Sequence, residues 1–224
     1  NWADNNKFKK ITEIFSCKNE SDILSEFFFI IANLYSSQEQ YENSNLFLNI
    51  ANFLNPKFRF NTSLIIENNF GNENYKKTKV LLNRFNKKDE IYYWYKIKKI
   101  TQIISQESNQ EEAINYINSK FSKIENPSTK ILFDMGNIAK GFKKYQSSIN
   151  YYDSVISRIE KNSISYADLL YRRGGSYERL GKYEESDKDL LKSLEINQDD
   201  AYVLNYLAYS WLERDYKIEE AMEM

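Results

Sequence analysis

Residues 170–196 read LYRRGGSYERLGKYEESDKDLLKSLEI, and this stretch decides the fold. Gly174 lies in the first of two apolar helical patterns, and Ser186 lies in the second, three residues after Tyr183. A short polar stretch around Gly181 separates the two patterns. Antiparallel helices approach to about 8–10 Å only where the facing side chains are small. The stretch therefore predicts two antiparallel helices that pack closely through Gly174 and Ser186.

The markers of this hairpin recur along the chain at intervals of about 35 residues. Each marker tyrosine precedes an apolar helical pattern, and a small residue follows it by three positions. Pro56 and Pro127 are 71 residues apart (127 − 56), and each is expected to stop a second helix because proline lacks the N–H. The recurrence predicts a stack of hairpins that bury their apolar faces against one another. The tyrosines are Tyr41, Tyr75, Tyr145 and Tyr183, and the small residues are Ser44, Thr78, Ser148 and Ser186.

Small residues also mark the first helix of most predicted pairs, and large residues on the second helix fill the space around them. A glycine inside a helix costs about 1 kcal/mol relative to alanine, so close packing must return at least that much. Asn and Asp cluster where helices are expected to start or end, because their side chains cap helices. The small positions are Ala32, Gly136, Gly174 and Ala208, the large ones are Leu48, Leu82, Tyr152 and Leu190, and the caps are Asn55, Asn126, Asn197, Asp199 and Asp200.

These residues resemble the tetratricopeptide repeat (TPR) family, most clearly over Phe28–Pro56 and Leu170–Ile196. The resemblance implies an all-α fold, a right-handed superhelix or α-solenoid of stacked antiparallel hairpins. Its units lie near 25–58, 59–93, 94–128, 129–166, 167–200 and 201–224, the last truncated. Residues 1–24 are expected to form a helix that caps the array or ends an upstream repeat. The stretch from Val203 to Leu212 is similar to a repeat variant of long, often exported bacterial proteins.

The composition excludes several kinds of chemistry. With 0 His and 1 Cys in 224 residues, the chain has no Ser-His-Asp or Cys-His system, no His-ligated metal and no internal disulfide. The carboxylate pairs Glu184/Glu185, Asp187/Asp189 and Asp199/Asp200 are adjacent or nearly so, and on a helix such acids point in different directions, which makes them poor acid–base pairs. We therefore expect no enzyme activity, no cofactor and no metal site. The longest apolar run is far short of the roughly 20 residues that span a bilayer, so no membrane span is expected in this segment.

In the resembled family, peptides bind the concave side that the first helices line. Tyr and Arg are the residues expected at binding hot spots, and Asn side chains can hold a peptide backbone. Stacked repeats also use aromatic residues as packing between repeats, and both interpretations stay open. The candidate partner-binding residues are Phe133, Asn137, Tyr171, Arg172, Arg179, Tyr202, Asn205, Tyr206 and Tyr209.

The function that follows is a non-catalytic scaffold or adaptor that binds a protein or peptide, and two alternatives remain. Residues 73–99 carry 9 Lys/Arg against 3 acids around Tyr92, Tyr93, Trp94 and Tyr95, a pattern compatible with RNA binding. A solvated helix face explains that pattern better, so nucleic acid is not the expected partner. The other alternative is a spacer that self-associates through the exposed ends of the array. The family resemblance suggests a bacterial cell envelope or periplasm, with the cytoplasm as the alternative.

Overall fold

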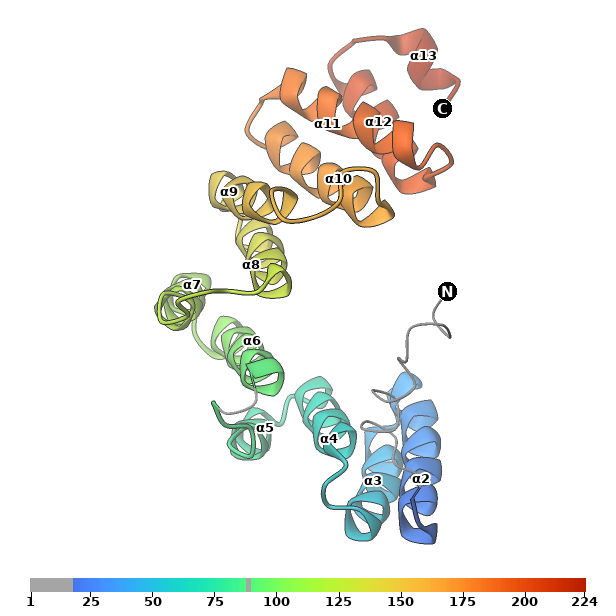
Figure 1. Cartoon of the computed structure of the whole chain (residues 1–224), viewed down its shortest axis with the longest axis vertical. Coiled ribbons are helices and arrows are strands. Elements are labelled where there is room, and N and C mark those ends of the chain that lie inside the picture. Colours follow the sequence, from blue (N-terminus) through green and yellow to red (C-terminus); the bar gives the residue numbers. More distant parts are fainter. Residues whose placement is uncertain (1–17, 88–89) are drawn as a thin grey trace. The chain divides into compact units, whose positions relative to one another are not determined.

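The computed structural model describes residues 18–87 and 90–224. Most of the helix expected over residues 1–24 lies outside the described residues. Within them every regular element is a helix (Figure 1). The helices are α2 (Glu20–Ser37), α3 (Tyr41–Leu54), α4 (Arg59–Gly71), α5 (Tyr75–Leu82), α6 (Glu90–Glu107), α7 (Gln110–Phe121), α8 (Thr129–Gly141), α9 (Tyr145–Ile156), α10 (Ile164–Glu178), α11 (Tyr183–Ile196), α12 (Ala201–Glu213) and α13 (Ile218–Met222).

The chain divides into two compact units, Asn1–Ile103 and Ile104–Met224, and the division falls within α6. In the N-terminal unit, α2 and α3 form an antiparallel hairpin (Figure 1). Ala32 and Leu48 are fully buried in it and form a cluster with Ile65 of α4. The Ser44 hydroxyl donates a 2.7 Å hydrogen bond to the Ala32 carbonyl oxygen, which ties the two helices together at their small positions.

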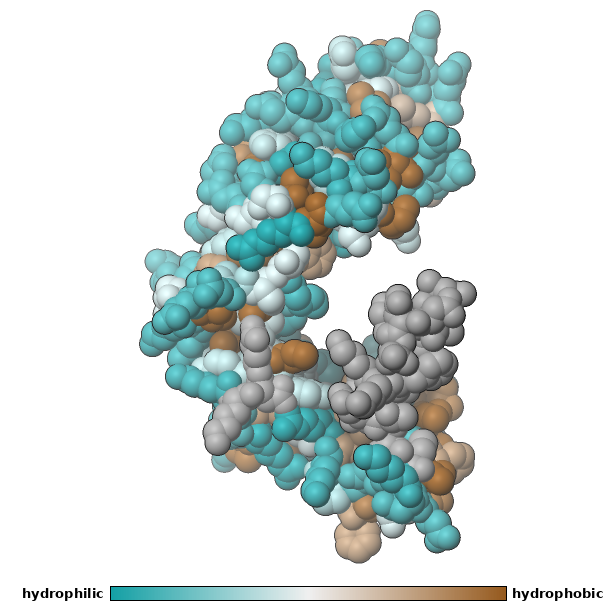
Figure 2. Space-filling view, in the orientation of Figure 1, coloured by the Kyte–Doolittle hydropathy of each residue, from teal (hydrophilic) through white to brown (hydrophobic). Residues whose placement is uncertain are grey.

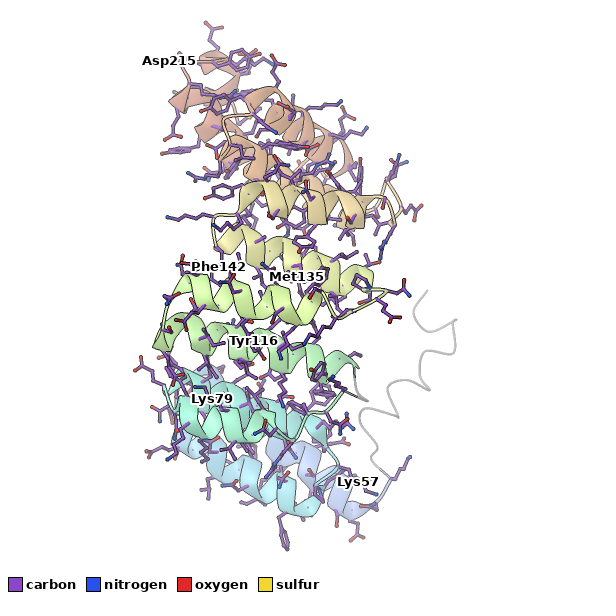
Figure 3. The ribbon with its side chains drawn as sticks, turned by 90° about the vertical axis from the view of Figure 1, so that its left-hand side faces the viewer. Lys57, Lys79, Tyr116, Met135, Phe142 and Asp215 are labelled. Carbon is purple, nitrogen blue, oxygen red and sulfur yellow. The ribbon has the colours of Figure 1, made fainter. Side chains whose placement is uncertain are left out.

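The C-terminal unit contains the hairpins α8–α9, α10–α11 and α12–α13 (Figure 1). Figure 3 marks Met135 on α8 and Phe142 in the turn after it. Tyr152 of α9 fills the space beside Gly136, and Leu190 of α11 packs beside Gly174. The Arg173 guanidinium on α10 bonds to Asp189 on α11 and to Asp153 on α9, so one side chain joins consecutive hairpins. The prediction of an all-α stack of antiparallel hairpins is confirmed within each unit.

The marker tyrosines are the first residues of α3, α5, α9 and α11. The small residue three positions later is fully buried in each of these helices. The residue two positions before the tyrosine has a positive φ in all four turns, and only one of the four, Gly181, is a glycine. The others are Glu39, Glu73 and Lys143.

Helix ends agree with the predicted caps at Asn55, Asn197 and Asp200, but Asn126 caps no helix, because Ser122 is the C-cap of α7 and Ser128 is the N-cap of α8. Asn55 follows α3, Asn197 follows α11, and Asp200 accepts hydrogen bonds from the first backbone N–H groups of α12. Pro127 does not stop a helix, because α7 already ends at Phe121, well before the proline. The prediction for Pro127 is therefore wrong, since a turn that starts at Ser122 ends α7.

Candidate functional site

Helices α8, α10 and α12 are the first helices of the three C-terminal hairpins, and their side chains meet on one face. The Arg172 guanidinium of α10 lies 5.2 Å from the centre of the Phe133 ring on α8. Toward α12, the Tyr171 ring of α10 and the Tyr206 ring of α12 meet edge to face, with their centroids 5.8 Å apart. We call this surface the first-helix face. It comprises Phe133, Asn137, Lys140, Asp168, Tyr171, Arg172, Gly175, Glu178, Arg179, Tyr202, Asn205, Tyr206 and Tyr209.

Arg172 is the centre of a polar network on this face. Its Nε donates a 2.9 Å hydrogen bond to Asp168, and its Nη1 donates a 3.4 Å hydrogen bond to the side-chain Oδ1 of Asn137. The hydrogen bond to Asp168 raises the pKa of Arg172, so this cation is permanently charged. The Tyr152 hydroxyl also donates to Asn137 Oδ1, at 2.8 Å. Asn137 therefore keeps only its amide NH₂ group for a ligand, which is less than the sequence predicted.

Tyr206 is half-buried against the core of the α11–α12 region. Its hydroxyl donates a 2.9 Å hydrogen bond to Glu178. Burial raises the pKa of Tyr206, and the bond to Glu178 adds to this rise, so the phenol stays neutral at physiological pH. Tyr171 is also half-buried in this cluster. These two tyrosines match the alternative interpretation, in which aromatic residues pack between repeats.

The exposed members of the predicted set lie on α12 and at the end of α10. Tyr202 is 80% exposed and Tyr209 is 61% exposed. Asn205 and Arg179 are exposed as well. Tyr202, Tyr206 and Tyr209 follow helical spacing, so the exposed rings flank the half-buried one on the same side of α12. The structure thus brings the predicted residues onto one face and divides them into a packed set and an exposed set.

Gly175 forms a notch in the first-helix face that the sequence interpretation did not assign. A Cβ atom at this position would lie 2.8 Å from the Lys140 Nζ of α8 and 3.3 Å from the Tyr206 hydroxyl of α12. Lys140 reaches over the glycine and donates a 3.2 Å hydrogen bond to the Arg172 carbonyl oxygen. Burial lowers the pKa of Lys140, and the Arg172 and Arg179 charges lower it further. The available signal was the doubled Gly174-Gly175, of which the hairpin contact explains only the first.

A pocket of about 470 Å³ adjoins Phe133 at the start of α8 and α10. Its lining is mainly apolar and includes Phe133, Ile159, Ile164 and Leu169, with Lys130 and Asp168 as charged members. Ile164 is 64% exposed. Figure 2 shows hydrophobic patches among hydrophilic surface in the region of α8 to α12. The pocket has the size and lining to accept an apolar side chain of a ligand.

Residues 167–200, which run from α10 through α11 to the cap of α12, match a family model described as Tetratricopeptide repeat. The chain contains a tetratricopeptide repeat. The resemblance expected from the sequence is confirmed. In this TPR, Gly174, Gly175 and Ser176 are the buried small residues of the first helix.

Solved structures of TPR type are similar to most of the chain. The APC/C hetero-tetramer Cut9–Hcn1 matches with 14% identity and a TM-score of 0.56, covering 93% of this chain and 40% of that chain. YrrB, described as a TPR protein with an unusual peptide-binding site, has 18% identity, coverages of 88% and 95%, and a TM-score of 0.47. A MamA RS-1 ArsTM double mutant has 12% identity, coverages of 92% and 90%, and a TM-score of 0.48. No curated protein matches the sequence.

The aromatic residues of the basic stretch 73–99 contact other protein groups in the N-terminal unit. Trp94 is buried, and the Tyr92 ring stacks on Phe85 with centroids 4.8 Å apart. The Tyr95 hydroxyl donates a 2.6 Å hydrogen bond to Glu67, and Lys99 forms a 2.8 Å ion pair with the same carboxylate. RNA binding by this stretch stays a prediction, and these contacts do not favour it.

The remaining expectations concern membranes, metals and self-association. In residues 18–87 and 90–224, no helix is long and apolar enough to cross a membrane. The same residues contain no cluster of three His, Cys, Asp or Glu side chains that would hold a metal ion. Hydrophobic patches lie over α2 in Figure 2, where Phe27, Ile30 and Leu34 are exposed. Self-association through the ends of the array stays a prediction.

Proposed function

We propose that the chain is a non-catalytic interaction scaffold that binds an extended segment of a partner protein on the first-helix face. The first-helix face supports this proposal most strongly, because Arg172 contacts Phe133 of α8 and Tyr171 contacts Tyr206 of α12. It joins three helices into one half-buried surface with a pocket at one side and exposed tyrosines at the other. Aromatic and Arg side chains of this kind supply most of the energy of protein recognition.

Three members of the acidic pairs have structural partners, which favours structural over catalytic roles for them. Asp187 bonds to Arg214 at 2.8 Å, Asp189 bonds to Arg173, and Asp200 caps α12. A scaffold needs none of these groups for chemistry. Their roles in stability and capping fit the proposed non-catalytic function.

The test is selection of random peptides on the 224-residue chain, followed by affinity measurements with the selected peptides made synthetically. The double variant Tyr202→Ala/Tyr209→Ala removes two exposed rings and is expected to fold like the wild type, since surface substitutions change stability by only about 0.5 kcal/mol. We expect its affinity for the peptides to fall about tenfold or more. Phe53→Ala, which removes a ring that is 84% exposed on α3, is the matched control and should bind like the wild type. Unchanged affinity in the double variant would contradict the proposal.

A further inference from the structure

We propose that the partner segment presents an acidic side chain, Asp or Glu, to Lys140 at the Gly175 notch. This inference rests on the proposed function of the first-helix face, and it names the chemistry of the partner. The inference follows from which cations and carboxylates of the first-helix face form ion pairs with one another.

Three cations and two acids meet around the notch, and two pairs form among them. Arg172 pairs with Asp168 at 2.9 Å. Arg179 pairs with Glu178 at 3.3 Å, and the same carboxylate accepts the Tyr206 hydrogen bond.

The remaining cation, Lys140, forms no ion pair with a carboxylate of the described residues. Among the described residues no carboxylate forms an ion pair with its ammonium group, which donates only to a backbone carbonyl oxygen. A lysine ammonium has three N–H donors, so two of them are left for a ligand. The five groups together carry a net charge of +1 (3 − 2), which one carboxylate would neutralise.

Gly175 itself is buried, and the partly exposed Lys140 side chain, which covers it, is the group that a ligand can reach. Arg172 precedes Gly175 by three residues and Arg179 follows it by four, so both cations lie on the same side of the helix as the glycine. With no side chain at Gly175, the Lys140 ammonium lies directly against the α10 backbone between them. A ligand carboxylate at this point meets positive charge from two helices.

A bound carboxylate would also relieve the unfavourable environment of Lys140. Burial and the charges of Arg172 and Arg179 lower its pKa, and the Glu178 and Asp168 carboxylates offset only part of this effect. An opposite charge within hydrogen-bond distance favours the charged form. Charge-assisted hydrogen bonds of this kind are about twice as strong as neutral ones.

The position of the notch points to a side chain of the partner and not to its chain end. Gly175 lies on α10, the middle of the three first helices. The Phe133 pocket lies on the α8 side and the exposed Tyr209 lies on the α12 side. A segment that contacts both continues past the notch in both directions, so the acid belongs to an internal residue.

The experiment uses random peptides fused at their C-terminal ends to a phage coat protein, which leaves no free peptide carboxylate. They are selected on the wild-type chain, on Lys140→Met and on Lys144→Met. Methionine keeps the length of the side chain and removes the charge, and the exposed Lys144 is a matched control in the turn after α8. We expect Asp or Glu to be enriched at one position with the wild type and with Lys144→Met. This enrichment should disappear with Lys140→Met, while the preference for apolar side chains remains.

A synthetic peptide and its Glu→Gln or Asp→Asn version give the quantitative test. The neutral peptide should bind the wild type about tenfold more weakly, and Lys140→Met should bind both versions equally. If Lys140→Met unfolds at a lower temperature than the wild type, Gly175→Ala replaces it, because the added methyl group displaces the Lys140 ammonium group and meets the Tyr206 hydroxyl only at 3.3 Å. Gly175→Ala should likewise discriminate only weakly between the acidic peptide and its neutral version.

The possible results separate this inference from the proposed function. If the wild-type chain selects no peptides, the proposed function fails. If it selects apolar peptides without an enriched acid, or if Lys140→Met retains the enrichment, only the acidic partner is excluded. A peptide that binds through a free C-terminal carboxylate, shown by comparing its acid and amide forms, would overturn the inference in the same way.

Discussion

The ring of Tyr152 on α9 occupies the space that a side chain at Gly136 on α8 would need. A Cβ atom at Gly136 would lie 2.5 Å from Tyr152 Cε1 and 2.7 Å from Cδ1. Tyr152 is fully buried, so its ring has little room to move. The sequence predicted Gly136 as the small position of a first helix and Tyr152 as a large residue of the second, and their contact confirms both.

Gly136→Ala should therefore destabilise the chain. The collision with a buried ring costs up to about 3 kcal/mol and helix propensity returns about 1 kcal/mol, so we expect a net loss of up to about 2 kcal/mol in the free energy of unfolding. Urea denaturation measures this change. Gly141→Ala is the control on the same helix, because a Cβ atom there has no atom within 4 Å. Equal stability of the two variants would contradict the packing argument.

Gly175→Ala is expected to separate stability from binding. The atoms that a Cβ atom would meet are the ends of the flexible Lys140 and Tyr206 side chains, which can shift. Removing a glycine from a helix interior favours the folded state by up to about 1 kcal/mol, so stability should be unchanged or higher. Affinity for selected peptides should fall, because the displaced groups fill the notch. Lower stability would contradict the argument that the Lys140 and Tyr206 side chains can shift, and binding like the wild type would show that the notch is not used.

The turns between paired helices give a third prediction. Lys143 and Gly181 occupy equivalent turn positions, and both have a positive φ, 58° for the lysine and 72° for the glycine. The left-handed conformation costs a residue with a Cβ atom about 1–2 kcal/mol. Lys143→Gly should thus raise the free energy of unfolding by about 0.5–1 kcal/mol, and Gly181→Ala should lower it by a similar amount. Thermal unfolding of both variants tests the expected opposite signs, and a change in the same direction would contradict it.

The sequence predicted the hairpins well because close helix packing requires small residues at fixed intervals. Tyr183 begins α11, Ser186 is fully buried, and Gly174 of α10 packs against Leu190 of α11. The turn before α11 was equally visible through Gly181. At Lys143 the same conformation had no sequence signal, since a charged residue adopts it in this turn.

The depth of each side chain was not predictable from helical spacing. Spacing places Tyr202, Tyr206 and Tyr209 on one side of α12, yet only Tyr206 is anchored to Glu178. The hydrogen-bond partner Glu178 belongs to α10, and the spacing of residues along α12 carries no information about α10. The isolated charge of Lys140 was hidden for the same reason, because it results from how two other cations on α10 are paired. Helical spacing thus predicted which side chains share the first-helix face, but it did not predict the Gly175 notch within that face.

Arg173 joins consecutive hairpins, and its loss should be costly. It donates two 2.7 Å hydrogen bonds to Asp189, which is only 5% exposed. Arg173→Met would leave this carboxylate buried without its partner, and such losses cost about 3–5 kcal/mol. Urea denaturation should show a loss of this size, whereas Lys188→Met, at an exposed site on α11, should have little effect. A loss below about 1 kcal/mol would show that the network adds little to stability.

The loss caused by Arg173→Met should shrink in acid. Burial raises the pKa of Asp189, and Arg173 opposes this rise in the wild type. In the variant Arg173 no longer lowers the Asp189 pKa, so the folded state takes up a proton at a higher pH than the unfolded state does. Its stability relative to the wild type then rises as the pH falls through that pKa. Denaturation curves between pH 8 and about pH 5 test the sign, and a difference that is constant with pH would contradict it.

The affinity for an acidic peptide should fall as the pH rises through the lowered pKa of Lys140. In the free chain, burial and the charges of Arg172 and Arg179 hold this pKa below 10.5, while Glu178 and Asp168 partly compensate. A bound carboxylate raises it, so binding takes up a proton in the range between the two values, and affinity decreases with pH there. Tyr206 does not titrate in this range, because burial and Glu178 raise its pKa. Titration calorimetry of the wild type and Lys140→Met across this range should show a decline only in the wild type. A parallel decline in both would assign the proton uptake to another group.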